Sequence, residues 1–177
     1  ELTAALRRDG SIQAPLFTVA TDFVTHGMWV TEPCEGTFVA TPEAGEYLVA
    51  QGVDRARVHE TGIPIDPSFR VPRTPRACRE RLGLPSDRPV VALLGGGYAP
   101  GVAASLLRGV VGIETPLSVL AVAGGDDARR TGLDGVATGA AARHAVRVLG
   151  FTDRMPEVLA AADLLLTKAG GLTVAEG

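Results

Sequence analysis

Short apolar runs, separated by turns rich in glycine and proline, dominate the hydrophobic pattern of this 177-residue chain. The run at residues 89–94, Pro-Val-Val-Ala-Leu-Leu, has no alternating polar positions, so it predicts a strand buried on both faces, as in a parallel sheet. Comparable runs predict further strands at residues 15–20, which we expect to be buried, and at 37–40, 57–61, 117–123, 148–149 and 163–167. Helical patterns lie between most of these runs, at residues 41–51, 74–82, 101–111 and from residue 126 onward. The alternation of strand and helix from residue 89 to residue 176 predicts a doubly wound α/β domain.

Two of the predicted helices begin with the same pair of residues, a threonine followed by a proline. Thr41 and Thr74 are expected to cap their helices through the hydroxyl group, with Pro42 and Pro75 at the first helical position. The first of these helices should stop at Gly52. Residues 132–142 receive no assignment, because three glycines weaken any helix there: Gly132, Gly135 and Gly139.

Residues 66–75 differ in composition from their surroundings, with three prolines and few apolar residues, and are predicted to link two domains. The chain would then consist of one domain at residues 1–70 and another at residues 71–177. No initiator methionine or signal-peptide pattern stands at the start, and Gly177 interrupts what should be the second turn of a helix. We therefore expect a piece of a longer protein, cut at both ends.

Composition and charge narrow the functions that this chain could have. Its 17 basic and 20 acidic residues leave a net charge of −3, without the concentrated basic face that a nucleic-acid surface needs. Cys34 and Cys78 lack the spacing of a disulfide framework or a CxxC motif, which indicates reduced thiols and a cytoplasmic protein. No apolar run is long enough to span a bilayer. The sequence also has no Asp-x-Asp pair and no cluster of His, Cys and Asp that would predict a metal site.

The strongest candidate for a binding site is the stretch that follows the last predicted strand. This strand runs through Lys168 into Gly170 and Gly171, where a helix is expected to begin, so free backbone N–H groups would lie where an anion can bind. Lys168 stands at the ligand-facing end of the strand, a position that favours contact with a phosphate or a sugar. Glu176 lies three residues after Thr173, about one helical turn on, where its carboxylate could accept hydrogen bonds from ribose hydroxyls. Phosphate beside the glycines and ribose beside Glu176 together predict a nucleotide site.

A second glycine turn, at residues 95–97, also lies between a strand and a helix, which is the usual place of a phosphate cradle. It is not a GxGxxG motif, because Pro100 occupies the last required position, and it is not a Walker loop. The glycine pair at residues 124–125 follows another predicted strand. We interpret the two acids after this pair, Asp126 and Asp127, as residues that favour a helix N-terminus.

A loop near the start of the chain combines an acid, a histidine and the chain's one tryptophan. Asp22, His26 and Trp29 fall within eight residues, directly after a predicted strand. A grouping of this kind is more typical of a site lining than of a structural turn.

Several of these motifs resemble the monogalactosyldiacylglycerol synthase and processive diacylglycerol glucosyltransferase family, a glycosyltransferase family 28-like group related to the lipid II GlcNAc transferase. In the nucleotide-sugar half the resemblance lies in Gly150-Phe151, Met155, Ala162-Asp163 and Lys168-Ala169-Gly170-Gly171-x-Thr173-x-x-Glu176. Upstream it lies in Thr21-Asp22-x-x-x-His26-x-x-Trp29 and in Thr61-Gly62-Ile63-Pro64-Ile65 followed by Phe69. It covers almost the whole chain and implies a GT-B fold, with two Rossmann-like domains that face a cleft. Residues 1–70 would end the acceptor-side N-terminal domain, and residues 71–177 would form most of a truncated donor domain, which binds the UDP-sugar.

The resemblance also implies a reaction and a set of contacts. The parent protein would transfer a hexose from a UDP-sugar to a lipid such as diacylglycerol in glycolipid biosynthesis, with no cofactor besides the donor and no metal. Its general base would be a histidine that precedes Glu1, and His26 would border the acceptor cleft, so the chain alone is expected to be inactive. The backbone at Phe151 and Thr152 would pair with the uracil edge. The implied nucleotide-sugar contacts are Gly95, Gly96, Gly97, Phe151, Thr152, Met155, Lys168, Gly170, Gly171, Thr173 and Glu176.

Other enzymes and partners stay open at this point. On the same fold the parent could be a lipid II-type GlcNAc transferase or a UDP-GlcNAc 2-epimerase. The most remote alternative is an NAD-dependent oxidoreductase domain that uses residues 95–101, for which Asp126 lies too far beyond the glycines to be the required acid. A membrane-associated parent, peripheral at the inner face of the membrane, could place a basic run on anionic lipid headgroups, although a solvated helix face is the simpler interpretation. That run comprises Arg70, Arg73, Arg76, Arg79, Arg81 and Arg88.

Overall fold

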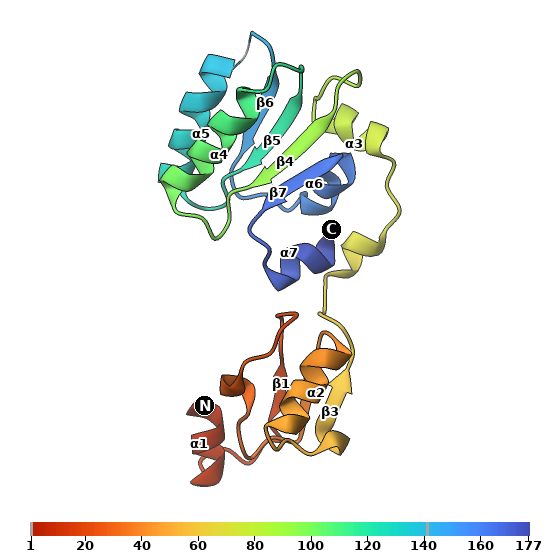
Figure 1. Ribbon diagram of the computed structural model, residues 1–177, viewed down its shortest axis with the longest axis vertical. Coiled ribbons are helices and arrows are strands. Elements are labelled where there is room, and N and C mark those ends of the chain that lie inside the picture. The colour runs from red at the N-terminus through yellow and green to blue at the C-terminus, as the bar shows by residue number, and fades with distance from the viewer. Residues whose placement is uncertain (1, 141) are drawn as a thin grey trace. The chain divides into compact units, whose positions relative to one another are not determined.

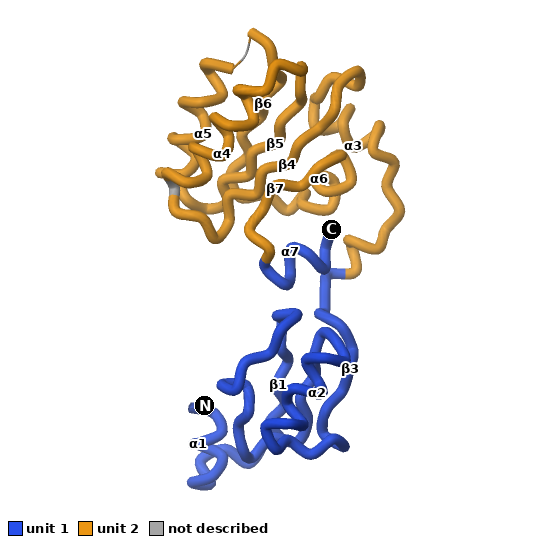
Figure 2. Tube along the Cα trace, in the orientation of Figure 1, with its two compact units in different colours: residues 1–66, 170–177 blue, residues 67–169 orange. Residues whose placement is uncertain are grey.

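The computed structural model describes residues 2–140 and 142–177, and the chain divides into two compact units (Figures 1 and 2). Unit 1 consists of residues 1–66 and 170–177, and unit 2 of residues 67–169. The boundary between them falls inside the stretch predicted to link two domains, where η3 (Pro67–Arg70) forms a short 3-10 helix. Residues 170–177 group with unit 1 and not with the segment directly before them, so the division by contacts differs there from the division made on the sequence.

Unit 2 is built on a parallel four-stranded sheet with the order β6-β5-β4-β7 (Figure 1). Its strands are β4 (Val90–Leu94), β5 (Ser118–Val122), β6 (Ala145–Leu149) and β7 (Leu164–Thr167). Its helices are α3 (Pro75–Arg81), α4 (Pro100–Val111), α5 (Asp127–Ala140) and α6 (Met155–Ala161). Helices α4 and α5 cover one face of the sheet, and α3 and α6 cover the other (Figure 1). The predicted doubly wound α/β architecture is therefore confirmed.

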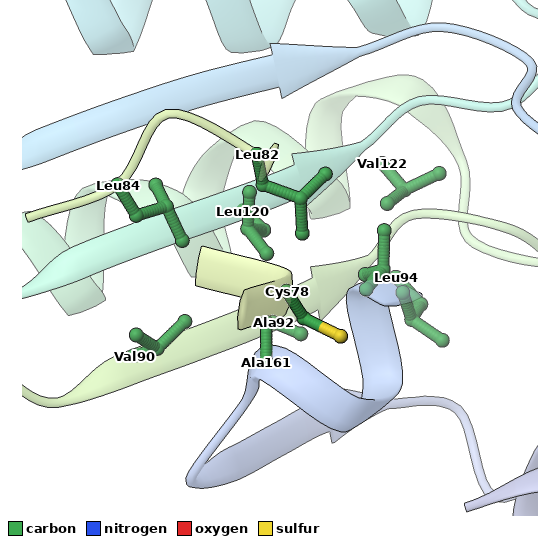
Figure 3. Packing of buried hydrophobic residues seen from close by; sticks show 10 residues of the cluster. Cys78, Leu82, Leu84, Val90, Ala92, Leu94, Leu120, Val122 and Ala161 are labelled. Carbon is green, nitrogen blue, oxygen red and sulfur yellow. The ribbon is translucent and has the colours of Figure 1, made fainter. Parts of the chain in front are cut away.

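Alternate positions of β4 supply the two hydrophobic cores of unit 2. Val90, Ala92 and Leu94 belong to the cluster under α3 and α6 (Figure 3), and Val91 and Leu93 belong to the cluster under α4 and α5. Because side chains alternate across a strand, burial of all five positions requires helices on both faces of the sheet. The prediction made for this apolar run is confirmed.

Helix α5 runs through all three of the glycines that made residues 132–142 ambiguous in the sequence. Leu133 is fully buried against the cluster under α4 and α5. A Cβ at Gly132 would lie 3.6 Å from the Cβ of Ala104 on α4, an ordinary contact distance, so the packing of the two helices does not require glycine at this position. Tertiary packing thus outweighs the low helix propensity of glycine, about 1 kcal/mol per residue. Residue 141, near the end of the ambiguous range, lies outside the described residues.

Unit 1 contains a parallel sheet in the order β1-β2-β3, with strands β1 (Phe17–Val19), β2 (Gly36–Val39) and β3 (Val58–Glu60). Its helices are α1 (Leu2–Arg8), α2 (Pro42–Ala50) and α7 (Gly171–Glu176), with short 3-10 helices η1 (Gly27–Trp29) and η2 (Arg55–Arg57). Val39, Ala44 and Leu48 lie at the centre of its core. The burial predicted for residues 15–20 is wrong at three positions, because Pro15, Phe17 and Val19 are exposed, and Ala20 alone of the six is fully buried. Along the described chain β1 pairs with β2 on one side only, and Phe17 and Val19 are 53% and 45% exposed.

The two predicted threonine caps behave differently. The hydroxyl of Thr41 accepts a hydrogen bond from the N–H of Ala44 at 3.2 Å, and Gly52 follows the end of α2 with a φ of 97°, so this helix prediction is confirmed. Thr74 precedes α3, but its hydroxyl makes no capping hydrogen bond, so the cap prediction is wrong there. Pro75 removes one of the unpaired N–H groups and fixes its own φ near the helical value, which lets α3 begin without that bond.

Asp163 ties the start of β7 to the start of β4. Its Oδ2 accepts a hydrogen bond from the N–H of Val90 at 2.7 Å, and its Oδ1 pairs with Nη2 of Arg79, also at 2.7 Å. The hydrogen bond from the N–H of Val90 is the larger cause that holds the pKa of this carboxyl below its ordinary value of about 3.9, and the guanidinium of Arg79 is the smaller cause. Because the folded-state pKa is depressed, the carboxylate stabilises the fold above about pH 4, and this contribution is lost as the pH falls through the folded-state pKa.

Replacement of this carboxylate should therefore have a pH-dependent effect on stability. Asp163→Asn is expected to lower the free energy of unfolding at neutral pH by about 1 kcal/mol, because the amide carries no charge for Arg79. In chemical denaturation, the difference from wild type should shrink once the pH drops below about 4. Asp87→Asn, which removes a carboxylate that is 72% exposed, is the control and should change stability by less than about 0.5 kcal/mol. A difference for Asp163→Asn that is the same at every pH would contradict this account.

Candidate functional site

All strands of unit 2 are parallel, so the segments that follow them share one edge of the sheet. Residues 95–99 follow β4, residues 123–126 follow β5, residues 150–152 follow β6, and Lys168 follows β7. From β4 the chain continues to β5 on one side, whereas β7 pairs with β4 on the other side (Figure 1). Ligands of such sheets bind outside the carboxyl ends of the strands, at the point where the strand order reverses. In unit 2 this point lies between β4 and β7.

The turn after β4 and the lysine after β7 lie side by side. Tyr98 donates its N–H to the carbonyl of Gly95 at 3.2 Å, and Gly97 has a φ of 77°, a conformation that favours glycine. A Cβ at Gly97 would lie 3.3 Å from Cδ of Lys168. Within the described part of the chain, no hydrogen bond uses the N–H of Gly96 or Gly97 or the ammonium group of Lys168. The structure thus places the side-chain stem of Lys168 against a turn with two unpaired N–H groups, and this combination of donors suits an anion.

Lys168 is also the one lysine of the chain, since the other 16 of its 17 basic residues are arginines. An ammonium group is a compact point charge, whereas a guanidinium group is planar and wider. Cδ of Lys168 lies against the glycine turn, so the side chain extends along this turn.

Gly95 is required for a different reason than Gly97. It is buried, and its N–H donates to the carbonyl of Val122 on β5 at 2.8 Å. A Cβ here would lie 2.9 Å from the carbonyl oxygen of Val122 and 2.7 Å from Cδ of Arg129. No side chain fits between these atoms, so glycine is needed where the chain leaves β4.

Arg129, in the first turn of α5, is a residue of this edge that motif reasoning missed. Its side chain is 13% exposed, with Nη1 donating to the carbonyl of Ala123 at 2.7 Å and Nη2 to the carbonyl of Tyr98 at 2.9 Å. Asp126 pairs with Nη2 at 3.2 Å, and its Oδ1 accepts the backbone N–H of Arg129 at 2.8 Å. The interpretation of Asp126 as a residue of the helix N-terminus is thereby confirmed. A signal for Arg129 was present, because an arginine in the first turn of a helix opposes the helix dipole and needs partners of its own.

The segment after β6 presents an aromatic side chain to solvent. Phe151 is 86% exposed, and the hydroxyl of Thr152 accepts the N–H of Arg154 at 3.1 Å. Met155 instead packs against the cluster under α3 and α6, so its side chain contributes to the core. The contacts of Phe151, Thr152 and Met155 with a nucleotide stay predictions.

The remaining candidates lie in unit 1. Helix α7 begins at Gly171, with Gly170 before it, as predicted. Gly171 is buried, and a Cβ at this position would overlap the carbonyl oxygen of Thr21. Thr173 and Glu176 are half-buried, and burial raises the pKa of the Glu176 carboxyl. This carboxylate has no hydrogen-bond partner among residues 2–140 and 142–177, so it is available to hydroxyl donors.

The candidates therefore fall into two groups. Unit 2 contains residues 95–97, Phe151, Thr152 and Lys168 along one sheet edge, whereas the four candidates from Gly170 to Glu176 belong to unit 1. One site that combines both groups stays a prediction.

Unit 1 has a pocket of its own, with a volume of about 440 Å³. His26 and Trp29 line it, and Asp22 does not. Nδ1 of His26 accepts the N–H of Met28 at 3.2 Å, which leaves Nε2 as the nitrogen that carries the proton in the neutral ring. The other lining residues are Thr3, Ala4, Leu16, Thr18, Met28 and Thr31.

Most of the basic run near α3 is engaged within the protein. Five of its six arginines form ion pairs with carboxylates or hydrogen bonds to carbonyl groups. These are Arg73 with the carbonyl of Ser68 (2.6 Å), Arg76 with Glu80 (3.0 Å), Arg79 with Asp163 (2.7 Å), Arg81 with Glu157 (3.5 Å) and Arg88 with Asp87 (3.4 Å). The run is not one solvated helix face as interpreted, because three of its members, Arg76, Arg79 and Arg81, lie on α3 and the side chain of Arg79 is 15% exposed. Contact with lipid headgroups stays a prediction.

Two kinds of feature are absent from the described part of the chain. It holds no group of three or more His, Cys, Asp or Glu residues that could bind a metal ion. None of its helices combines the length and the apolar character needed to cross a bilayer.

Two parallel α/β units, the second with glycine turns at the carboxyl edge of its sheet, are typical of the GT-B class. MurG of Acinetobacter baumannii aligns with a TM-score of 0.59 and 20% identity, over 97% of this chain and 44% of that protein. Alr3699/HepE of Anabaena, solved in complex with UDP-glucose, aligns with a TM-score of 0.53 and 15% identity, over 86% of this chain and 46% of that protein. These likenesses confirm the predicted GT-B fold.

Sequence comparison gives the family resemblance. The family model of monogalactosyldiacylglycerol (MGDG) synthase matches residues 1–65. A processive diacylglycerol beta-glucosyltransferase of Bacillus thuringiensis (strain Al Hakam) is 27% identical over 172 residues, which are 97% of this chain and 44% of the relative. The predicted resemblance to this family is therefore confirmed. The chain spans less than half the length of the relative, and the match to the family model ends before the glycine turns of unit 2.

Proposed function

We propose that this chain carries the donor-binding part of a UDP-sugar-dependent hexosyltransferase, which in its whole length transfers a hexose to a lipid such as diacylglycerol. The observation that carries the proposal is the close approach of the turn at residues 95–97 to Lys168, at the point where the strand order of unit 2 reverses. A nucleoside diphosphate is bound by N–H donors and a cation, and this edge offers both. The name of the matched relative, a diacylglycerol glucosyltransferase, supports the sugar and the acceptor.

Sugar transfer requires groups that stabilise the charge of the departing diphosphate, and the carboxyl edge of the sheet in unit 2 carries such groups. The bond between hexose C1 and the β-phosphate oxygen of UDP breaks, and a bond forms between C1 and the oxygen of the acceptor hydroxyl. The hydroxyl proton passes to a general base, and the bonding electrons leave with UDP. Negative charge therefore grows on the diphosphate, where the N–H groups of Gly96 and Gly97 and the ammonium group of Lys168 would stabilise it. The resemblance assigns the base to a histidine before Glu1, so we expect the chain alone to bind donor without transferring its sugar.

The nucleoside would be held by the other candidates. The exposed segment at Phe151 and Thr152 would pair its backbone with the uracil edge, and Glu176 would accept hydrogen bonds from the ribose hydroxyls. Burial raises the pKa of Glu176 because the carboxylate loses water without gaining a partner. Two hydroxyl donors would supply the missing hydrogen bonds, so the ionised carboxylate is the form that binds UDP.

This role of Glu176 predicts a pH dependence of binding. Because the ionised form binds, the affinity for UDP should fall as the pH decreases through the raised pKa of Glu176, above the ordinary value of about 4.3. Isothermal titration of wild type and Glu176→Gln across this range would isolate the effect, because the phosphate groups of UDP titrate in both. We expect the variant to bind more weakly, by about tenfold at neutral pH, and its deficit to shrink as the pH decreases. Equal affinity of the two proteins at neutral pH would remove Glu176 from the site.

The proposed function itself is tested by ligand-dependent stability. Thermal unfolding of the 177-residue chain would be compared in the presence of UDP, UDP-glucose and NAD. A ligand at 100 times its dissociation constant stabilises the folded state by about 2.7 kcal/mol, which raises the melting temperature measurably. Stabilisation by UDP and not by NAD supports the proposal, and stabilisation by NAD alone would replace it with an oxidoreductase. Measurable sugar transfer by the isolated chain would contradict the part of the proposal that concerns the base.

A further inference from the structure

We propose that Arg129 is a positioning residue of the donor site, whose guanidinium group fixes the turns after β4 and β5 relative to each other without touching the nucleotide. The inference rests on the proposed function, because the position of these turns affects activity only if a diphosphate binds beside them. Its structural part, that one arginine holds two loops in place, can be tested without any ligand.

Two donors of one rigid group hold the two turns. Nη1 donates to the carbonyl of Ala123 at 2.7 Å, where the turn with Gly124 begins, and Nη2 donates to the carbonyl of Tyr98 at 2.9 Å, where the turn with Gly97 ends. A carbonyl oxygen belongs to a planar peptide group, so each hydrogen bond also fixes the orientation of that group. The two donors of a guanidinium are held at a constant spacing by its planar geometry, and the two turns are therefore kept at a set separation.

The neighbours of Arg129 are adapted to this side chain. Gly95 leaves room for its stem, because a Cβ there would lie 2.7 Å from Cδ of Arg129. Asp126 balances its charge through the pair at 3.2 Å and accepts its backbone N–H at 2.8 Å. An arginine in the first turn opposes the helix dipole, and these contacts offset that repulsion. Gly95, Asp126 and Arg129 therefore depend on one another for their positions.

The same contacts separate the role of Arg129 from that of Lys168. The charge of Arg129 is already paired with Asp126, its two Nη atoms donate within the protein, and the side chain is largely buried. Lys168 is exposed and has no partner in the described part of the chain. Arg129 therefore acts through the turns, and Lys168 is the cation that would meet the phosphate.

The opposite edge of the same sheet offers a matched control. The side chain of Arg79 is 15% exposed, against 13% for Arg129, and Arg79 likewise combines a carbonyl partner with a carboxylate. Its Nε donates to the carbonyl of Ala161 at 2.9 Å, and its Nη2 pairs with Asp163 at 2.7 Å. These partners lie at the amino ends of β4 and β7, away from the glycine turns. Arg79→Gln thus removes one carbonyl contact and one carboxylate contact from one edge, and Arg129→Gln removes two carbonyl contacts and one carboxylate contact from the other.

The experiment compares Arg129→Gln, Arg129→Lys and Arg79→Gln with wild type in the whole chain. Amide hydrogen exchange should be followed at Gly95 and Tyr98 in one turn and at Ala123 in the other, because their N–H groups donate to carbonyl groups. It should accelerate about tenfold or more in Arg129→Gln and stay unchanged in Arg79→Gln, although both variants lower the melting temperature. The affinity for UDP should fall about tenfold in Arg129→Gln and stay within about twofold of wild type in Arg79→Gln. Arg129→Lys keeps the charge but cannot span two carbonyls, so it should also lose most of the affinity.

The outcomes separate the inference from the proposed function. Unchanged exchange at both turns in Arg129→Gln would overturn the inference, and so would wild-type affinity for UDP in Arg129→Gln or in Arg129→Lys. If Arg129→Gln does not fold, Arg129→Lys, which keeps most of the stem, decides the same comparison. A wild-type chain that does not bind UDP would overturn the proposed function, while the exchange measurement would still decide whether Arg129 holds the turns.

Discussion

Replacement of Lys168 with methionine is expected to weaken the binding of UDP by about 10- to 100-fold while changing the free energy of unfolding by less than about 0.5 kcal/mol. The side chain is exposed and has no partner in the described chain, so its loss leaves no buried group unsatisfied. A hydrogen bond between an ammonium group and a phosphate is worth about 1.5–3 kcal/mol, which gives the expected loss of affinity. Methionine has a similar length and keeps the contact with the turn at Gly97.

Chemical modification of Lys168 can test directly whether this side chain contacts UDP. Because Lys168 is the one lysine, an amine-selective reagent can modify only its side chain and the N-terminal amine, and peptide mapping separates the two. UDP should protect Lys168 from modification and leave the N-terminal amine reactive. Arg108→Met, on the exposed face of α4, is a control for the loss of one positive charge and should leave the affinity for UDP unchanged. Full reactivity of Lys168 under saturating UDP would show that the diphosphate binds elsewhere.

The strands and glycine turns could be predicted from the sequence because their signals are local. The apolar run at residues 89–94 has to be buried on both faces, and the structure places it at the interior of the sheet between β5 and β7. A parallel sheet brings the segments after its strands to one edge, and residues 95–97 and Lys168, which the resemblance assigned to one site, both follow strands of this sheet. The same reasoning failed at Phe17 and Val19, because an apolar run does not reveal whether its strand lies at a sheet edge.

Other features could not be predicted, because they depend on contacts between residues far apart in the sequence. The sequence can show that Arg129 stands in a first helical turn and needs partners there. It cannot show which partners it has, because one of them is Tyr98, 31 residues earlier. Gly95 looks like part of a flexible turn, but its need for glycine comes from the approach of Val122 and Arg129. A motif shows which residues recur at a given spacing. The residues at these two positions depend instead on which atoms lie beside them in the folded chain.

Gly171 is the glycine whose Cβ position lies nearest to other backbone atoms, those of Thr21. Gly171→Ala should detach α7 from unit 1, because the added Cβ would overlap the carbonyl oxygen of Thr21 and lie 2.9 Å from its carbonyl carbon. The obstructing atoms belong to the backbone and cannot turn aside as a side chain could, and the Cδ1 of Ile63 at 3.0 Å closes another direction. Overpacking of this kind costs about 1–3 kcal/mol. A helix of six residues is marginal alone, so the strain is relieved most easily when α7 leaves its contact and frays.

The expected result is therefore local and can be told apart from general destabilisation. In Gly171→Ala, amides 174–177 should lose protection from hydrogen exchange, while the amides of β2 and β3 keep theirs. The affinity for UDP should also fall, because Glu176 belongs to the same helix and would lose its fixed place. Gly109→Ala, in the last turn of α4, is the matched control, since a Cβ there meets nothing within 4 Å and the change should stabilise the protein by up to about 1 kcal/mol. Full protection of α7 in Gly171→Ala would mean that the helix does not rest on the backbone of Thr21, and the place of Glu176 in the proposed site would then lose its structural support.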